Sequence, residues 1–181
     1  MARLTDIRPE TMSPEQRRVH ESIAGGPRGA VGGPFVALLR SPELCDRVQK
    51  VGEYLRFETS LPARLRELAI LMVARHHSAH YEWHAHAPLA EQAGIAPSVI
   101  IAIRERRRPD FSDPLDGAVY AFVRELLDKH GVSDPVYRPV LLRIGEQGAV
   151  DLVAVVGYYT LIALTLNTFQ IPTPDGKSPF V

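Results

Sequence analysis

The hydrophobic positions along the chain recur at helical spacing. The segment 64–77 shows this most clearly, because its apolar residues fall at i, i+3, i+4, i+7 and i+8, the positions that share one face of a helix. These residues are Leu65, Leu68, Ala69, Met72 and Val73. We therefore predict a helix here that packs on one side against the rest of the molecule.

Proline, glycine and capping residues divide the remaining chain into similar pieces. Helices are predicted at about 13–24, 42–56, 62–77, 79–93, 97–108 and 114–130, from about 135, and at 149–169. We expect Ser78 to cap the helix at 79–93, Gly94 to end it and Pro88 to kink or break it. The Gly-rich segment 28–34 and the Pro-rich tail 171–181 are expected to be loops. No linker separates two domains, so one all-α domain is expected.

Residues 149–166 are apolar nearly all round and form the one candidate membrane span in the sequence. This run contains Asp151 and barely reaches the length of a membrane-spanning helix. A helix buried in the core or in a subunit interface is therefore favoured, and no membrane partner is expected.

The charge balance excludes a general attraction to anionic partners, because 21 lysines and arginines balance 21 aspartates and glutamates. The basic run 104–108 fits a solvated helix end, so nucleic acid is not expected as a partner. Cys45 is the only cysteine, and residues 1–23 lack the apolar core of a signal peptide. We expect a cytoplasmic protein whose 181 residues form a single core.

Candidate chemistry is concentrated in one segment, since five of the seven histidines fall between His76 and His86. On a helix that starts near residue 78, Glu82 and His86 are four residues apart and share a face. Glu67, one helix earlier, can reach that face if the two helices pack together. A carboxylate and an imidazole opposite a second carboxylate can act as acid and base. The segment is therefore a candidate catalytic site.

Two other interpretations of this segment stay open. In the first, Glu67 pairs with a neighbouring arginine, Trp83 packs in the core and the histidines decorate a surface. In the second, His80 and His84 bind a metal ion, because their i, i+4 spacing can place two imidazoles on one ion. The segment contains no HExxH motif that would strengthen the metal interpretation.

The sequence RELAILMVARHHSAHYEWHAHAPLAEQAGI at 66–95 resembles the core of the carboxymuconolactone decarboxylase family, which belongs with the alkyl hydroperoxidase D-type proteins. The resemblance extends over about 34–176. It implies an all-α helical bundle of the alkyl hydroperoxidase D type, whose protomers assemble into homo-oligomers, trimers or hexamers. Residues 34–181 would form the family domain, and residues 1–33 an extension made of one helix and the Gly-rich loop.

The peroxidase branch of this superfamily carries a glutamate, a CxxC pair and a histidine. At those places this chain has Glu67, Ala79, Glu82 and His86, so both thiols are missing. Peroxide reduction by thiols needs a thiolate and usually a second, resolving thiol. The resemblance therefore favours the decarboxylase branch, whose members carry YEW-like residues in place of the CxxC pair. An antioxidant protein of the hydroperoxidase or peroxiredoxin type is the alternative.

The decarboxylase branch implies a carbon–carbon lyase that releases carbon dioxide from a small carboxylated lactone of aromatic catabolism, or a related proton-transfer reaction. No cofactor is implied, because the conjugated lactone carbonyl accepts the electrons left behind. We expect His86 to act as the acid/base, Glu67 to orient it and Glu82 to carry a second proton. The other residues expected to meet the substrate are His80, Tyr81, Trp83 and Arg75. A metal-binding helical oligomer that uses the 76–86 cluster is the remaining alternative.

Overall fold

The structure, a computed structural model, describes residues 3–5 and 7–180. These residues contain eight α-helices and no strand, which confirms the expected all-α class. The helices are α1 Pro14–Gly25, α2 Pro34–Leu38, α3 Pro42–Glu53, α4 Ala63–His76, α5 His80–Gln92, α6 Pro97–Arg104, α7 Pro114–Lys129 and α8 Asp134–Phe169. Two short turns accompany them, the 3-10 turn η1 Pro9–Thr11 and the π-helical turn η2 Tyr54–Glu58, which directly continues α3.

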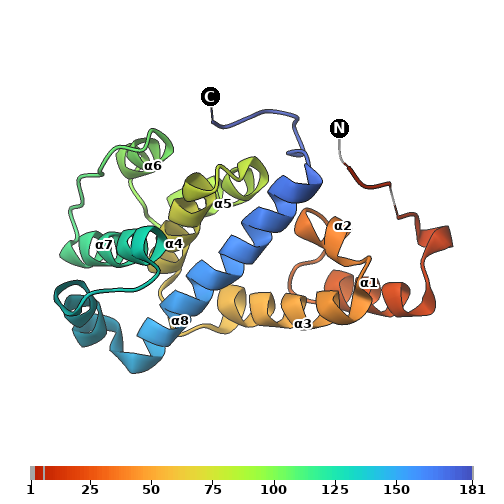
Figure 1. Ribbon diagram of the computed structural model, residues 1–181, viewed down its shortest axis with the longest axis horizontal. Coiled ribbons are helices and arrows are strands. Elements are labelled where there is room, and N and C mark those ends of the chain that lie inside the picture. Colours follow the sequence, from red (N-terminus) through yellow and green to blue (C-terminus); the bar gives the residue numbers. More distant parts are fainter. Residues whose placement is uncertain (1–2, 6, 181) are drawn as a thin grey trace.

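Helix α8 crosses the middle of the molecule, with α4 to α7 on one side and α1 to α3 on the other (Figure 1). Each side has its own hydrophobic cluster. The larger cluster joins α4 to α7 with Leu152, Val155 and Tyr159 of α8, and the smaller joins α1 to α3 with Ile162 and Leu166 of α8. The long helix therefore ties two cores together.

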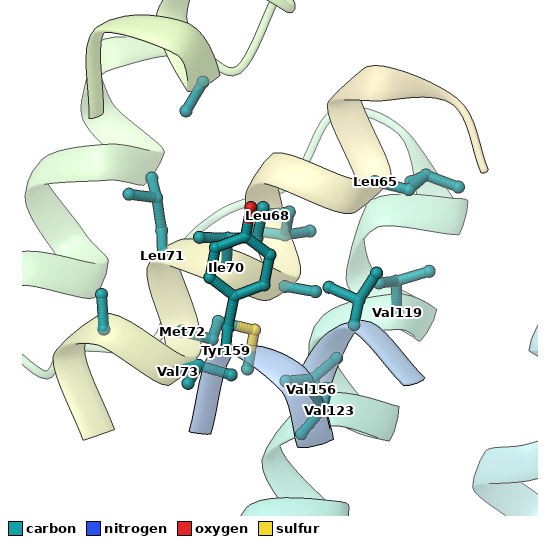
Figure 2. Packing of buried hydrophobic residues seen from close by; sticks show 14 of the residues in the cluster. Leu65, Leu68, Ile70, Leu71, Met72, Val73, Val119, Val123, Val156 and Tyr159 are labelled. Atoms are coloured by element: carbon teal, nitrogen blue, oxygen red, sulfur yellow. The ribbon is translucent and has the colours of Figure 1, made fainter. Parts of the chain in front are cut away.

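Helix α4 is the centre of the larger cluster. Nine of its residues are buried, Leu65, Leu68 and Leu71 among them, and each buried leucine contributes about 1.5–3 kcal/mol relative to an exposed one. Figure 2 shows these side chains in one cluster with Tyr159 of α8 and Val119 of α7. The apolar stripe in the sequence is thus confirmed as a core face, although α4 is buried on more sides than the stripe indicates.

The connection between α4 and α5 differs from the prediction. Ser78 has a left-handed φ of 50° and does not cap α5, which begins at His80 after Ala79. Pro88 was expected to kink or break the helix, but α5 continues through it to Gln92. Proline removes one helical hydrogen bond, but the helix is held on both sides of it because Trp83 and Ala90 are packed in the core with α4.

Other helix boundaries also differ. α6 ends at Arg104, before the rest of the basic run, because Arg106 adopts a left-handed φ of 58° that closes the helix. The two helices predicted after residue 133 form a single element that is interrupted at Gly145, whose φ of 70° is not helical. α8 is long and apolar enough to cross a membrane by length and composition, but half of its most apolar stretch is buried in the molecule.

Candidate active site

Glu67 and His86 form a buried pair between α4 and α5. The short turn at 77–79 lays the two helices against each other, which brings the middle of α4 opposite the second turn of α5. Oε2 of Glu67 lies 2.7 Å from Nδ1 of His86, and the two residues are only 2% and 6% exposed. The predicted approach of the two side chains is therefore confirmed.

The surroundings of Glu67 favour its ionised form. Burial alone would raise its pKa, but the hydrogen bond and the electrostatic interaction with the His86 ring outweigh that effect. Arg66 adds a further contact, with Nε 3.3 Å from Oε1. The pKa of Glu67 is consequently held below its usual value. Because Nδ1 of His86 is hydrogen-bonded to Glu67, Nε2 is the ring nitrogen available for proton transfer. Nε2 makes no hydrogen bond within the described residues.

Glu82 lies one turn before His86 on α5 and has the opposite character. It is 2% exposed, and among the described residues neither of its carboxylate oxygens has a hydrogen-bond partner. Burial without a compensating charge raises its pKa well above the usual value. The surroundings thus favour the ionised form of Glu67 and the protonated form of Glu82, which is the separation of roles that acid–base catalysis needs.

A pocket of about 230 Å³ opens beside these residues. Glu82 and His86 form part of its wall, together with three tyrosines, Tyr81, Tyr158 and Tyr159. The ring of Tyr159 packs edge-on against the His86 ring at 5.0 Å, and burial raises the pKa of its hydroxyl, so it stays a neutral hydrogen-bond group. The pocket is smaller than the roughly 300–1,000 Å³ that is typical of sites for drug-sized ligands, so it suits a small molecule.

Two arginines in the pocket wall were not found by sequence reasoning. Arg28 comes from the Gly-rich segment and Arg56 from the π-helical turn η2. Ala30, Gly32 and Pro34 of the same Gly-rich segment also line the pocket, so the predicted loop lies across the site. The many glycines between 25 and 33 were the only indication in the sequence. They predicted a loop but did not indicate which residues the loop would cover.

Three of the residues expected to meet the substrate lie elsewhere. His80, Trp83 and Arg75 do not line this pocket and instead gather around Phe180 of the C-terminal tail, with ring or cation contacts of 5.0, 5.1 and 4.6 Å. Arg75 also donates to the backbone oxygen of Arg104 at 2.6 Å. Of the substrate contacts predicted from sequence, only Tyr81 is placed in the pocket.

The histidines at 76–86 do not form a group arranged to hold a metal ion. Among residues 3–5 and 7–180, no group of three or more histidine, cysteine, aspartate or glutamate side chains is arranged to hold a metal ion. His84 instead lies 3.6 Å from Asp175 of the tail. His76 belongs to α4, and its ring packs on His77, so it is not on the helix that carries His80 and His84.

Cys45 lies outside the pocket. It is fully buried in the smaller cluster, among Val19, Val48 and Leu166. Burial, assisted by the negative charge of Asp46, raises the pKa of its thiol to about 11. A thiol in this environment is a poor nucleophile at neutral pH, because the thiolate is the reactive form.

A family model matches the part of the chain that contains this site. A model of the carboxymuconolactone decarboxylase family matches residues 42–125, a range that includes Glu67, Glu82 and His86 but not Arg28. No curated protein matches the chain significantly. The match therefore covers the acid–base residues and stops short of the N-terminal part of the pocket.

Several solved structures share the fold. One is an alkylhydroperoxidase AhpD core, an uncharacterized peroxidase-related protein from Ralstonia eutropha JMP134, with 16% identity and a TM-score of 0.78 over 96% of this chain and 93% of that one. A second is the debrominase Bmp8, with 12% identity and a TM-score of 0.73 over 97% and 92%. A third is an uncharacterized peroxidase-related protein from Silicibacter sp. TM1040, with 14% identity and a TM-score of 0.72 over 94% and 90%. At these identities the likeness establishes the fold alone.

Proposed function

We propose that this protein is a lyase which decarboxylates a small carboxylated lactone by proton transfer. Its resemblance to the superfamily of carboxymuconolactone decarboxylases and alkyl hydroperoxidase D-like proteins supports this reaction class. The observation that supports this most directly is that two neighbouring buried carboxyl groups have opposite surroundings. Glu67 contacts His86 at 2.7 Å, which lowers the pKa of Glu67, while Glu82 has no hydrogen-bond partner within the described residues, and burial raises its pKa.

The reaction makes two demands on the protein. When the carbon–carbon bond to the carboxylate breaks, carbon dioxide leaves and the electron pair moves into the conjugated lactone as a dienolate. The protein must stabilise the dienolate oxygen and then deliver a proton to carbon. The carboxyl of Glu82 is a suitable proton donor, because burial favours its protonated form and it lies in the pocket wall.

The Glu67–His86 pair can return a proton to Glu82 after the reaction. Once Glu82 has protonated the substrate carbon it is left as a carboxylate in a buried site, which is unfavourable. Nε2 of His86, one helical turn away, can pass a proton from solvent to Glu82, while Glu67 stabilises the imidazolium that forms. The sum is consumption of one proton and replacement of the carboxylate on the substrate by hydrogen.

Thiol-based peroxide reduction has less support. The pocket contains no cysteine among its lining residues, and Cys45 is buried elsewhere with a raised pKa. Such a mechanism would require Cys45 to become exposed and ionised, which the packing of the smaller cluster opposes.

The proposal is tested by supplying an unsaturated γ-lactone that bears a carboxylate at its γ carbon and measuring carbon dioxide release. We expect Glu67→Gln and His86→Ala each to lower kcat by about 10²–10⁴-fold, the usual contribution of a general acid or base. His84→Ala is the matched control, because His84 is on the same helix but outside the pocket. Full activity in the Glu67 and His86 variants would contradict the assigned roles.

A further inference from the structure

We propose that a second pocket, at the C-terminal end of α4, binds the di- or triphosphate group of a small organic molecule. The pocket has a volume of about 400 Å³ and lies between α4, the segment 106–108 that follows α6, and α7, all on the same side of α8 (Figure 1). Among the described residues, none lines both this pocket and the active-site pocket. The second site therefore goes beyond the function proposed above and does not depend on it.

Five arginines from three parts of the chain line this arginine pocket, and they include most of the basic run found in the sequence. They are Arg75 of α4, Arg106, Arg107 and Arg108 of the segment after α6, and Arg124 of α7. Asp128 is the acidic residue in the wall. Because five guanidinium groups face one carboxylate, the pocket has a positive potential, although the chain as a whole has no net charge. Such a potential concentrates anions.

Three of these arginines lack a counter-ion. Arg107 and Arg124 contact carboxylates at 2.5 and 3.6 Å. Arg75, Arg106 and Arg108 form no ion pair with any residue of 3–5 and 7–180. A guanidinium has five N–H donors, so these three side chains have binding capacity that the described residues leave unused.

Arg75 and Arg106 are held next to each other although they carry the same charge. Both donate to Oγ of Ser78, from Nη1 of Arg75 at 3.1 Å and from Nη2 of Arg106 at 3.3 Å. Burial and the nearby charge of Arg106 both lower the pKa of Arg75, which shows that the two groups repel each other. An anion that contacts both guanidinium groups would offset this repulsion, so the pair favours anion binding.

This pair is fixed in place by the ends of two helices. Nε of Arg75 donates to the backbone oxygen of Arg104, the last residue of α6, at 2.6 Å, and its guanidinium stacks on the Phe180 ring at 4.6 Å. Ser78 and Arg106, which follow α4 and α6, have left-handed φ values of 50° and 58°. Residues with a Cβ atom adopt this conformation only where their surroundings enforce it. The pair is thus preorganised, and an anion does not have to order it on binding.

The bottom of the arginine pocket is apolar. Met72 and Ile103 line it and are buried in the larger cluster, whereas Arg106 and Arg108 are exposed and form its rim. The pocket also shares Tyr120 with an adjoining groove of about 1270 Å³. An organic group attached to a phosphate at the rim therefore has both apolar surface and space to occupy.

The number and placement of the arginines favour a polyphosphate over a single carboxylate. A carboxylate has one charge and occupies one guanidinium fork, whereas a di- or triphosphate has several charges and presents oxygens to several forks at once. A nucleic acid fits less well, because it is an extended anion that needs basic groups along its backbone. The adjoining groove instead contains Asp110, Asp113 and Glu125, which would repel a nucleic acid.

The site can be tested by titration calorimetry of the full chain with inorganic pyrophosphate, at about 0.1 M salt, where charges more than about 10 Å apart are largely screened. We expect saturable binding that Arg75→Gln and Arg106→Gln each weaken by about 10- to 100-fold, the usual contribution of a hydrogen bond to a charged group. Acetate, with a single carboxylate, should bind at least about 10-fold more weakly than pyrophosphate. ADP should compete with pyrophosphate, because its diphosphate would occupy the same arginines.

Matched variants separate the loss of charge from the loss of structure. Arg108→Gln is the second variant if Arg75→Gln does not fold, because Arg108 is exposed and forms no ion pair with a described residue, and it should also weaken binding by about 10-fold. Arg104→Gln, in the same basic run but outside the pocket, should bind pyrophosphate like wild type. Arg28→Gln and His86→Ala, both in the active-site pocket, should also leave this binding unchanged.

Several results would overturn the proposal. Failure of pyrophosphate to bind wild-type protein, or unchanged affinity in every pocket variant, would remove the site. Binding that is lost in Arg28→Gln but kept in Arg75→Gln would assign the anion to the active-site pocket. Equal affinity for acetate, or ADP that does not compete, would refute an organic polyphosphate, and a single-stranded oligonucleotide that binds more tightly than ADP would assign the arginines to nucleic acid. Because only binding is measured, these outcomes are independent of whether the lactone is decarboxylated.

Discussion

Replacing Glu82 with glutamine is expected to stabilise the folded protein at neutral pH while it reduces activity. Glutamine has nearly the same shape and also leaves its buried polar atoms without partners, so the substitution changes little except the ability to ionise. In the folded protein burial raises the pKa of Glu82 well above its usual value, whereas in the unfolded chain the group titrates normally. The difference between the two states is a cost to stability.

The sign and size of this cost follow from proton linkage. A group whose folded pKa is raised binds more protons in the folded state, so stability falls as pH rises above the unfolded pKa. Each pH unit over which the folded carboxyl stays protonated while the unfolded one ionises costs about 1.4 kcal/mol. Between pH 5 and pH 7 the advantage of Glu82→Gln over wild type should therefore grow by up to roughly 3 kcal/mol.

The measurement is urea denaturation at pH 5, 6 and 7, at one protein concentration, followed by the fluorescence of the single tryptophan, Trp83, which is buried in the core. Glu91→Gln, an exposed position on the same helix, is the matched control and should show a constant difference from wild type. If the Glu82→Gln difference is equally flat, Glu82 ionises normally in the folded protein. Its role as a protonated acid would then be refuted.

Three further outcomes are expected. Gly52→Ala, in α3, should raise KM for the lactone, because the new Cβ displaces Arg28 and Tyr158 in the pocket wall; an unchanged KM in a folded variant would contradict this. Cys45→Ser should leave turnover unchanged but lower the free energy of unfolding by about 1–2 kcal/mol, because it buries a hydroxyl in an apolar cluster; peroxide consumption that depends on Cys45 would count against the lyase. Glu67→Gln should cost about 3–5 kcal/mol at pH 7 by breaking a buried pair. Since the pKa of Glu67 is lowered by folding, that loss should shrink as pH falls below about 4, which urea denaturation at pH 3.5, 5 and 7 can check.

The arrangement of the candidate acid–base residues could be predicted because its geometry is local. Glu82 and His86 share a helix face by spacing alone, and Glu67 is on the helix that precedes them by one short turn. Trp83, although adjacent to Glu82, points away from the pocket because successive helical residues are about 100° apart. Arg75 is on the same helix as Glu67 but eight residues further along, about 12 Å, which is too far to serve the same pocket.

The remaining residues of the pocket could not be predicted from the sequence, because they are brought together only by tertiary packing. Arg28, Gly52 and Arg56 lie in a loop, a helix and a π-helical turn, and no spacing in the sequence relates the first to the other two. The same reason applies to Phe180, which comes from the far end of the chain and occupies the space where His80 and Trp83 were expected to meet a substrate.

Helix α8 lies between the proposed acid–base residues and Arg28. The acid–base groups belong to α4 and α5 on one side, where nearly every neighbour is core, so substitutions there disturb folding and catalysis together. Arg28 belongs to the other side, and Tyr158 of α8 contacts both clusters. A change in residues 25–33 can therefore alter which substrate is bound while the Glu67–His86 pair keeps its geometry, because the larger core does not depend on that loop. The substrate that is bound is accordingly expected to vary with the N-terminal segment, and an assignment of substrate from the α4–α5 residues alone would leave out the part of the pocket wall that this segment forms.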